Sequence, residues 1–440
     1  MKQILSCSLV CAAALIATPA YAHPDETQLK CDTVCDAKQK TQKKKRRLSI
    51  GGYGEAVYSR NFYSDKYLRY TDPESYKNDR HGRFDLPHVV IYLGYDFGKG
   101  WSMGTEIEFE HGGTESAVEI EDEEGGEYEK EIERGGEVAL EQFWIQKTFF
   151  PQLNVRVGMQ VVPLGQTNSH HMPTEFFGVY RPEGENTIMP CTWHEIGLDV
   201  WGRAGDWRYE LMLLPGLDSE RFGNRGWIHD GSASPYEFKI GNQLAGAFRV
   251  DNYSVKGLRL SLSGYVGNSF RNTLTSTDNA KNKGIHGTVA IGAFDFCYND
   301  HNLIARGHFD YGHLSDSWHI SDFNMHMSKN SPSKRQKIGS DAIATGVEVG
   351  YNFFGLNRML TKKNQKFFVF GRYDYYDSQL RMERDVKDEW CHRSRWAAGI
   401  NYYPIRDVVI KAEYSIGVLA KQYNNEPAIN IGIAYSGWFL

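Results

Sequence analysis

Most of this chain is built from runs of about ten residues in which apolar and polar side chains alternate. In the run from Trp101 to Glu110, mainly apolar residues occupy the odd positions and small or acidic residues the even ones. Successive side chains of a β-strand point to opposite faces, so each run predicts a strand with one apolar and one polar face. Ten residues are enough to cross a bilayer as a tilted strand, whereas strands in soluble sheets average about five or six. The pattern therefore favours an all-β transmembrane barrel over a soluble β-sandwich or β-helix.

The spacing of these runs predicts about sixteen antiparallel strands. They lie near residues 48–62, 84–97, 100–111, 137–149, 153–161, 194–203, 206–214, 243–251, 257–267, 285–297, 302–312, 341–353, 366–377, 394–403, 407–418 and 427–439. Short turns such as Gly98-Lys99 alternate with long loops, although the 354–365 link is long for a turn and the 419–426 loop is short. Short periplasmic turns and long outer loops are typical of outer-membrane barrels. An even strand number lets the last strand pair with the first, which leaves no open edge in lipid.

The two ends of the chain are consistent with export to the outer membrane. Lys2, an apolar run and Ala20-Tyr21-Ala22 predict a signal peptide over residues 1–22 that is cleaved after Ala22. A polar segment over 23–47 then precedes the barrel of 48–440 and is expected in the periplasm, either as a solvated tail or as a short helix that contacts neighbours. The last strand ends in Trp438-Phe439-Leu440, and aromatic residues near many strand ends suit interfacial girdles.

Composition excludes several classes of protein. The formal charge of -5 becomes -6 when Lys2 leaves with the signal peptide, so we expect no nucleic-acid partner. The mature chain lacks an apolar run long enough for a membrane helix. Cys31 and Cys35 are close enough to form a disulfide or to remain as thiols, and without a CxxC or CxxCH motif we expect no cofactor. No hydrolase, zinc-protease or nucleotide-binding motif occurs, and no motif supports His286 and His308 as a catalytic pair, so we expect no enzyme.

Two predicted hairpins resemble those of the phosphate-selective porin O and P family. The first contains EVALEQFWIQK at 137–147 and VRVGMQVVPLG at 155–165, and the second contains GINYYP at 399–404 and VVIKAEY at 408–414. The similarity extends over roughly 137–270 and 341–440. The resemblance implies a sixteen-stranded outer-membrane barrel, often a homotrimer in lipid, with loops folded into the lumen. Phosphate-selective members of the family line the pore with arginines and lysines.

Alternation places both signs of charge on the lumenal face of the predicted strands. The pore-lining candidates are Arg156, Arg203, Arg208, Arg249, Arg259, Arg306, Arg372, Lys411, Glu106 and Glu108. Further inward acids match or exceed these bases in number, so a ring of unopposed cations is not expected. The sequence predicts a water-filled channel for small polar or ionic solutes with at most a weak preference for anions. Strict selectivity for phosphate is the less favoured alternative.

Residues 162–193 form the candidate constriction loop of this resemblance. The chemically notable side chains are His170, His171, Glu175 and Arg181. The spacing of the two histidines and the glutamate is a weak metal-binding pattern, so no metal site is assigned.

A second long loop, 112–136, contains ten acidic and two basic residues. The loop is interpreted as a solvated charged segment, with binding of divalent cations or repulsion of anions as alternatives. For the whole chain, the alternative to a porin is a non-transporting barrel that acts as a surface adhesin or assembly scaffold.

Overall fold

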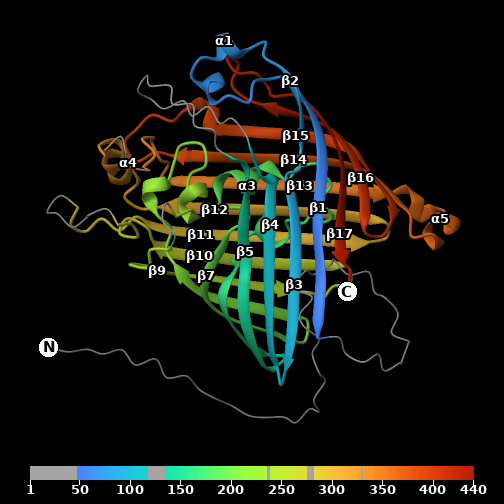
Figure 1. Ribbon diagram of the computed structural model, residues 1–440. Coiled ribbons are helices and arrows are strands. Elements are labelled where there is room, and N and C mark those ends of the chain that lie inside the picture. The colour runs from blue at the N-terminus through green and yellow to red at the C-terminus, as the bar shows by residue number, and fades with distance from the viewer. Residues whose placement is uncertain (1–46, 117–133, 235–237, 275–281, 329–330, 332) are drawn as a thin grey trace.

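The computed structural model describes residues 47–116, 134–234, 238–274, 282–328, 331 and 333–440 (Figure 1). The predicted signal peptide, Cys31, Cys35, nearly all of the 23–47 segment and most of the acidic loop lie outside the described residues. None of the helices in the described part is long and apolar enough to cross a membrane.

Strands make up most of the described chain, in a single sheet. The strands are β1 (Leu48–Asn61), β2 (His81–Asp85), β3 (His88–Gly98), β4 (Trp101–Ser116), β5 (Arg134–Phe150), β6 (Leu153–Val161), β7 (His194–Ala204), β8 (Trp207–Pro215), β9 (Leu244–Asn252), β10 (Leu258–Asn268), β11 (Thr288–Asp300), β12 (Leu303–Leu314), β13 (Asp341–Asn352), β14 (Lys366–Arg381), β15 (His392–Ile405), β16 (Val408–Val418) and β17 (Ala428–Trp438).

The sheet closes into a barrel, as the alternation predicted. From β3 to β17 each strand pairs antiparallel with the next, and β17 returns to β1 with a register that runs from Gly51 opposite Trp438 to Asn61 opposite Ala428. β2 and β3 pair with successive halves of β1, so together they occupy one strand position in the barrel. Pro87 lies at the break between them and has no N–H to donate to the ladder. The seventeen strands therefore occupy sixteen positions around the barrel. This confirms the predicted fold class, an antiparallel barrel of about sixteen strands.

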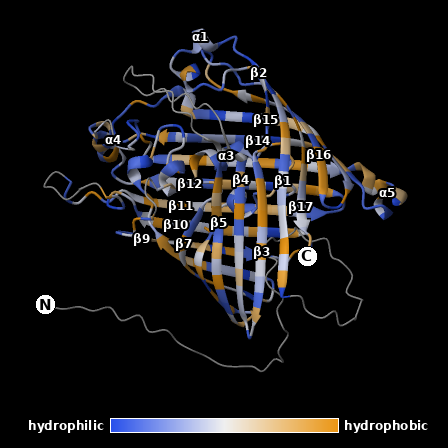
Figure 2. Cartoon of the chain, in the orientation of Figure 1, coloured by the Kyte–Doolittle hydropathy of each residue, from blue (hydrophilic) through white to orange (hydrophobic). Residues whose placement is uncertain are grey.

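The outer surface of the barrel is apolar and its inner surface is polar. On β17, Ile429, Ile431 and Ile433 are 41–49% exposed, whereas Asn430 between them is buried. The same alternation of apolar and polar residues is visible along many strands in Figure 2. A soluble barrel would have the opposite arrangement, because its outer face would meet water.

Short helical segments lie in the connections between strands. They are η1 (Tyr67–Tyr70), α1 (Pro73–Tyr76), α2 (Gln166–Ser169), α3 (Glu183–Ile188), η2 (Ser219–Arg221), η3 (His229–Ser232), α4 (Ser317–Met325), η4 (Phe353–Leu356), α5 (Arg358–Lys362) and η5 (Glu389–Cys391).

Long loops pack against the inner wall. Leu164 and Ile188 of loop 162–193, Phe222 of the β8–β9 loop and Ile320 of α4 share one buried cluster with wall residues such as Ala344. Burial of these side chains is the main force that can hold the loops in place. The loops that follow β6, β8 and β12 therefore narrow the lumen.

Candidate functional site

The loop of residues 162–193 connects β6 to β7 and lies inside the barrel. Val162, Leu164, Phe177, Ile188 and Trp193 in this loop are all buried. The loop reaches the far wall, where α3 packs against β13 and β14. It is therefore a docked element with defined contacts, and we call it the lumenal loop.

The middle of the lumenal loop docks through an aromatic contact. The Phe177 ring stacks on Phe370 of β14, with ring centroids 5.4 Å apart and an angle of 12° between the planes. The ring also covers Gly350 of β13, where a Cβ atom would lie 2.3 Å from the ring. The backbone N–H of Phe177 donates to Glu348 at 3.1 Å, and the Arg306 guanidinium lies 5.0 Å from the ring centroid. Only glycine at position 350 leaves room for this arrangement.

Lys411 of β16 holds the same part of the loop from another side. Its Nζ donates to the carbonyl oxygens of Phe176 at 3.0 Å and Gly178 at 2.7 Å. The ammonium also lies 4.2 Å from the centroid of the Phe176 ring, within the range of a cation–π contact. The sequence indicated that Lys411 faces the lumen, but gave no sign that it binds backbone of the loop.

The start of α3 connects the lumenal loop to the rim of the barrel. Glu183 accepts a hydrogen bond from the Tyr376 hydroxyl at 2.7 Å and forms an ion pair with Arg395 of β15. Burial alone raises the pKa of Glu183, but Arg395 and Arg393 outweigh burial and lower that pKa to about 2. Glu183 is therefore an anion at neutral pH and a fixed anchor for the loop.

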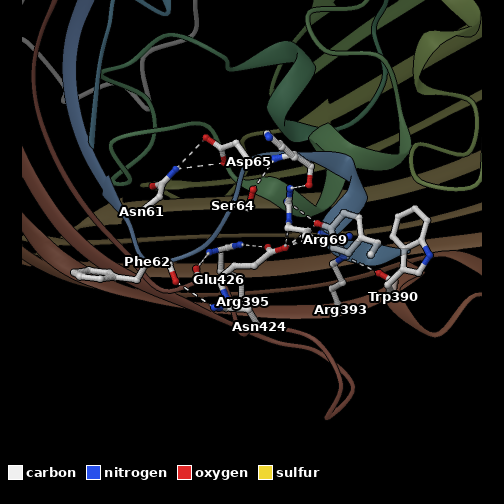
Figure 3. A network of polar contacts seen from close by, with 12 residues as sticks. Asn61, Phe62, Ser64, Asp65, Arg69, Trp390, Arg393, Arg395, Asn424 and Glu426 are labelled. Carbon is white, nitrogen blue, oxygen red and sulfur yellow. Dashed lines mark hydrogen bonds and ion pairs between the residues drawn. The ribbon is translucent and has the colours of Figure 1, made fainter. Parts of the chain in front are cut away.

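Arg395 also belongs to a polar network between the β1–β2 and β16–β17 loops, which Figure 3 shows in close-up. Glu426 is its centre and faces Arg395 at 3.0 Å and Arg69 at 3.1 Å. The Tyr70 hydroxyl donates to Glu426 at 2.7 Å, and the Tyr70 ring stacks on Trp390 with centroids 4.6 Å apart. The lumenal loop is thus tied to two outer loops through shared charges.

Glu185 joins the two short helices of the lumenal loop. Its carboxylate accepts hydrogen bonds from the backbone N–H groups of Gln166 at 3.1 Å and Thr167 at 3.0 Å. Burial and the neighbouring Asp310 raise the pKa of Glu185 to about 8, although His308 opposes them. This carboxyl is therefore a group of the loop whose charge changes near neutral pH.

The structure places nearly all pore-lining candidates of the wall inside the barrel, and six of the bases face a carboxylate. Lys411 binds the loop carbonyls and Arg203 lies exposed at the end of β7. Glu106 and Glu108 of β4 are buried on the lumenal side. The remaining six bases each face a carboxylate of the wall, in the pairs Arg156–Asp199, Arg208–Asp251, Arg249–Asp295, Arg259–Asp295, Arg306–Glu348 and Arg372–Asp374.

The four loop candidates point to different places. His170 contacts Glu175 at 3.4 Å and lies against Arg259 on its other ring nitrogen. Burial lowers the pKa of His170 and raises the pKa of Glu175 to about 7. Arg181 donates to the Tyr53 hydroxyl at 3.4 Å and to the backbone carbonyl of His171 at 3.3 Å. The His171 side chain points away from His170, toward β4 and β5. The structure therefore does not bring the two histidines and Glu175 together as one ligand set.

A small cavity separates the loop from the wall near these residues. It has a volume of about 20 Å³ and is lined by residues that include His170, Glu175, Arg306 and Glu348. This is enough space for about one water molecule. His286 and His308 are not paired in the described structure, because His286 lies exposed before β11 and His308 contacts Asp310 at 2.5 Å.

Glu141 of β5 was missed by the sequence reasoning. The apolar, outward residues of β5 fall at 138, 140, 143 and 145, so the alternation skips one residue between 140 and 143. That irregularity was the available signal, since an extra residue in a strand turns two neighbouring side chains to one face.

Comparisons with known proteins support the fold. No family model matches the chain. An uncharacterized protein of Aquifex aeolicus (strain VF5) is 32% identical over 184 residues, which is 42% of this chain and 36% of that protein. The chain therefore matches only about a third of that relative's length.

Solved porin structures share the architecture. The anion-selective porin from Comamonas acidovorans has a TM-score of 0.51 and 10% identity, over 89% of this chain and 99% of that one. The Salmonella typhi OmpF complex with daunomycin has a TM-score of 0.52 and 11% identity, over 89% of this chain and 97% of that one. The fold is that of a porin. The outer membrane channel DcaP of Acinetobacter baumannii also matches, with a TM-score of 0.50 and 10% identity over 89% of this chain and 97% of that one. Identities this low indicate a shared fold and nothing finer.

Proposed function

We propose that this chain is a non-enzymatic outer-membrane porin through which small polar or ionic solutes diffuse passively. The observation that carries the proposal is a closed barrel with sixteen strand positions, whose outer face is apolar and whose inner face is charged. A loop that docks inside the barrel narrows its lumen. An apolar exterior suits the hydrocarbon of a bilayer, and closure leaves no unpaired backbone edge there. Barrels of this size enclose an aqueous channel unless their lumen is filled.

We further propose that the channel prefers anions only weakly. Six of the predicted lumenal bases face carboxylates, and Lys411 is occupied by loop carbonyls. A cation that faces a carboxylate contributes little net field to a passing ion. Membership of the phosphate-selective O and P family rests on the two resembling hairpins, and strict phosphate selectivity is the less favoured version of the proposal.

Current through planar bilayers tests both statements. The purified mature protein should give discrete conductance steps in KCl, and a KCl gradient should give a small reversal potential. A reversal potential near the chloride limit, together with block by micromolar phosphate, would overturn weak selectivity and favour the phosphate-selective version. An absence of conductance steps would overturn the porin proposal itself.

The homotrimer that the resemblance implies is also a proposal. In a trimer, part of the apolar outer face of each barrel would be covered by its neighbours. Mass measurement in mild detergent should give three times the mature chain mass, and a uniform monomer would overturn the trimer.

One observation favours a second function, that of a non-transporting barrel which serves as a surface adhesin or an assembly scaffold. Leu217, Phe222, Trp227 and Ile228 of the β8–β9 loop and Phe270 of the β10–β11 loop are fully buried with the lumenal loop. Such a core resembles a plug more than the walls of a channel. The conductance measurement separates the two functions, because a plugged barrel conducts no ions.

A further inference from the structure

A β-bulge in β5 turns an additional carboxylate into the lumen. Glu106 of β4 pairs with Gln142, and the next residue, Ile107, pairs with Leu140, so Glu141 has no residue opposite it. Leu140 and Phe143 on either side are 48% and 45% exposed on the outer face. Glu141 and Gln142 therefore both point inward. Bulges commonly redirect side chains in this way near functional sites.

Glu141 meets two further metal-binding groups inside the barrel. One ligand atom each of Glu106, Glu141 and His171 lies within 4.8 Å of the other two. The three residues are 1%, 2% and 6% exposed. One carboxylate oxygen of Glu106 and one of Glu141 are buried without a hydrogen-bond partner. Carboxylate oxygens without a hydrogen-bond partner destabilise the protein interior, and two of them side by side also repel each other. A positive charge between them would offset both effects.

The histidine is oriented like a metal ligand. Its Nδ1 lies 3.0 Å from the backbone carbonyl of Asn168, to which an Nδ1–H would donate. Its Nε2 is buried and has no hydrogen-bond partner. Metal-binding histidines typically donate one ring N–H to a carbonyl or carboxylate, which leaves the lone pair of the other nitrogen for the metal.

Positive side chains near the cluster are directed elsewhere. In the described part of the chain, no arginine or lysine forms an ion pair with Glu106 or Glu141. Arg181 instead donates to the His171 carbonyl and to the hydroxyls of Thr192 and Tyr53. The amide of Gln142 donates to Glu106, but an amide carries no charge. Two buried carboxylates and a free imidazole nitrogen therefore converge without a protein cation between them.

We propose that Glu106, Glu141 and His171 bind one divalent transition-metal cation. His194 of β7 is a candidate fourth ligand, because its Nδ1 lies 3.9 Å from Glu141 and has no hydrogen-bond partner. Carboxylate oxygens combined with imidazole nitrogen suit Zn²⁺ and similar ions, whereas Ca²⁺ and Mg²⁺ favour all-oxygen sites. The ligands come from β4, β5 and the lumenal loop, so the ion joins the loop to the wall.

Zinc binding by the untagged, full-length mature protein in detergent tests the site. After removal of metals with a chelator, calorimetric titration with ZnCl₂ should give one tight site per chain, with Ca²⁺ and Mg²⁺ bound far more weakly. Glu141→Gln and His171→Ala should each weaken zinc binding by roughly 100-fold. The matched controls are Glu137→Gln and His301→Ala, which alter exposed residues of the same types and should leave the affinity unchanged.

Failure of wild-type protein to bind stoichiometric zinc would overturn the proposal, as would equal affinity in the ligand variants and the controls. If the variants do not fold, Co²⁺ added to wild-type protein provides a second test. A mixed carboxylate and imidazole site should give visible absorption bands that zinc abolishes, and their absence would also overturn the site. Neither measurement requires a conducting channel, so the result is independent of the proposed porin function.

Discussion

Replacement of Lys411 by methionine should loosen the lumenal loop without affecting the barrel. Lys411 is 2% exposed and donates two hydrogen bonds to loop carbonyls. Hydrogen bonds from a charged donor contribute about 1.5–3 kcal/mol each, which gives about 3–6 kcal/mol for the pair. Methionine also removes the desolvation cost of a buried ammonium, and this gain offsets several kcal/mol of the lost hydrogen-bond energy. We expect about 2 kcal/mol of net loss, or about a 30-fold shift toward the undocked loop.

Single-channel recording measures this shift, because an undocked loop opens the lumen. Lys411→Met should show more frequent and longer steps to a larger conductance than the wild type. Lys363→Met is the matched control, since it removes an exposed lysine from the β13–β14 link. Circular dichroism of both variants should match the wild type.

Identical conductance, open probability and current noise in Lys411→Met and wild type would refute the reasoning. That result would mean that the aromatic contacts and the Glu183–Arg395 ion pair hold the loop alone. An effect of equal size in Lys363→Met would instead attribute the change to net charge.

Three further outcomes are expected. Gly350→Ala should displace Phe177 at a cost of about 1–3 kcal/mol and raise the single-channel conductance, whereas Gly371→Ala has free space and should behave as wild type. Because burial and Asp310 raise the pKa of Glu185 to about 8, the stability that this group gives is fully present below its ordinary pKa of about 4.5 and is lost as the pH rises through 8. Amide hydrogen exchange near α2, corrected for intrinsic rates, should therefore lose protection as the pH rises from about 4.5 to 8 in the wild type, and should lose less in Glu185→Gln. The barrel should give β-type circular dichroism in detergent and migrate faster on gels before heating than after, and a helical spectrum would contradict the fold.

The sequence determined the barrel, because strand alternation is a local property. A period of two over ten residues sets which side chains face outward, whatever the rest of the chain does. Fifteen of the predicted strands correspond to single strands of the structure, and the sixteenth, near 84–97, is broken at Leu86 and Pro87. A wall charge such as Arg249 or Glu348 could be placed on the lumenal side for the same reason.

Only the tertiary structure decided which partners those lumenal charges have. Arg249 and Asp295 are 46 residues apart, and Lys411 and Gly178 are 233 apart, so no local pattern predicts their pairing. The path of the lumenal loop depends on where Phe177 and Glu183 find partners across the barrel. Glu141 joins Glu106 and His171 only because a bulge shifts the register of β5 and the loop crosses the lumen there. Such contacts form between segments that the closed barrel brings together, and closure is a property of the whole sheet.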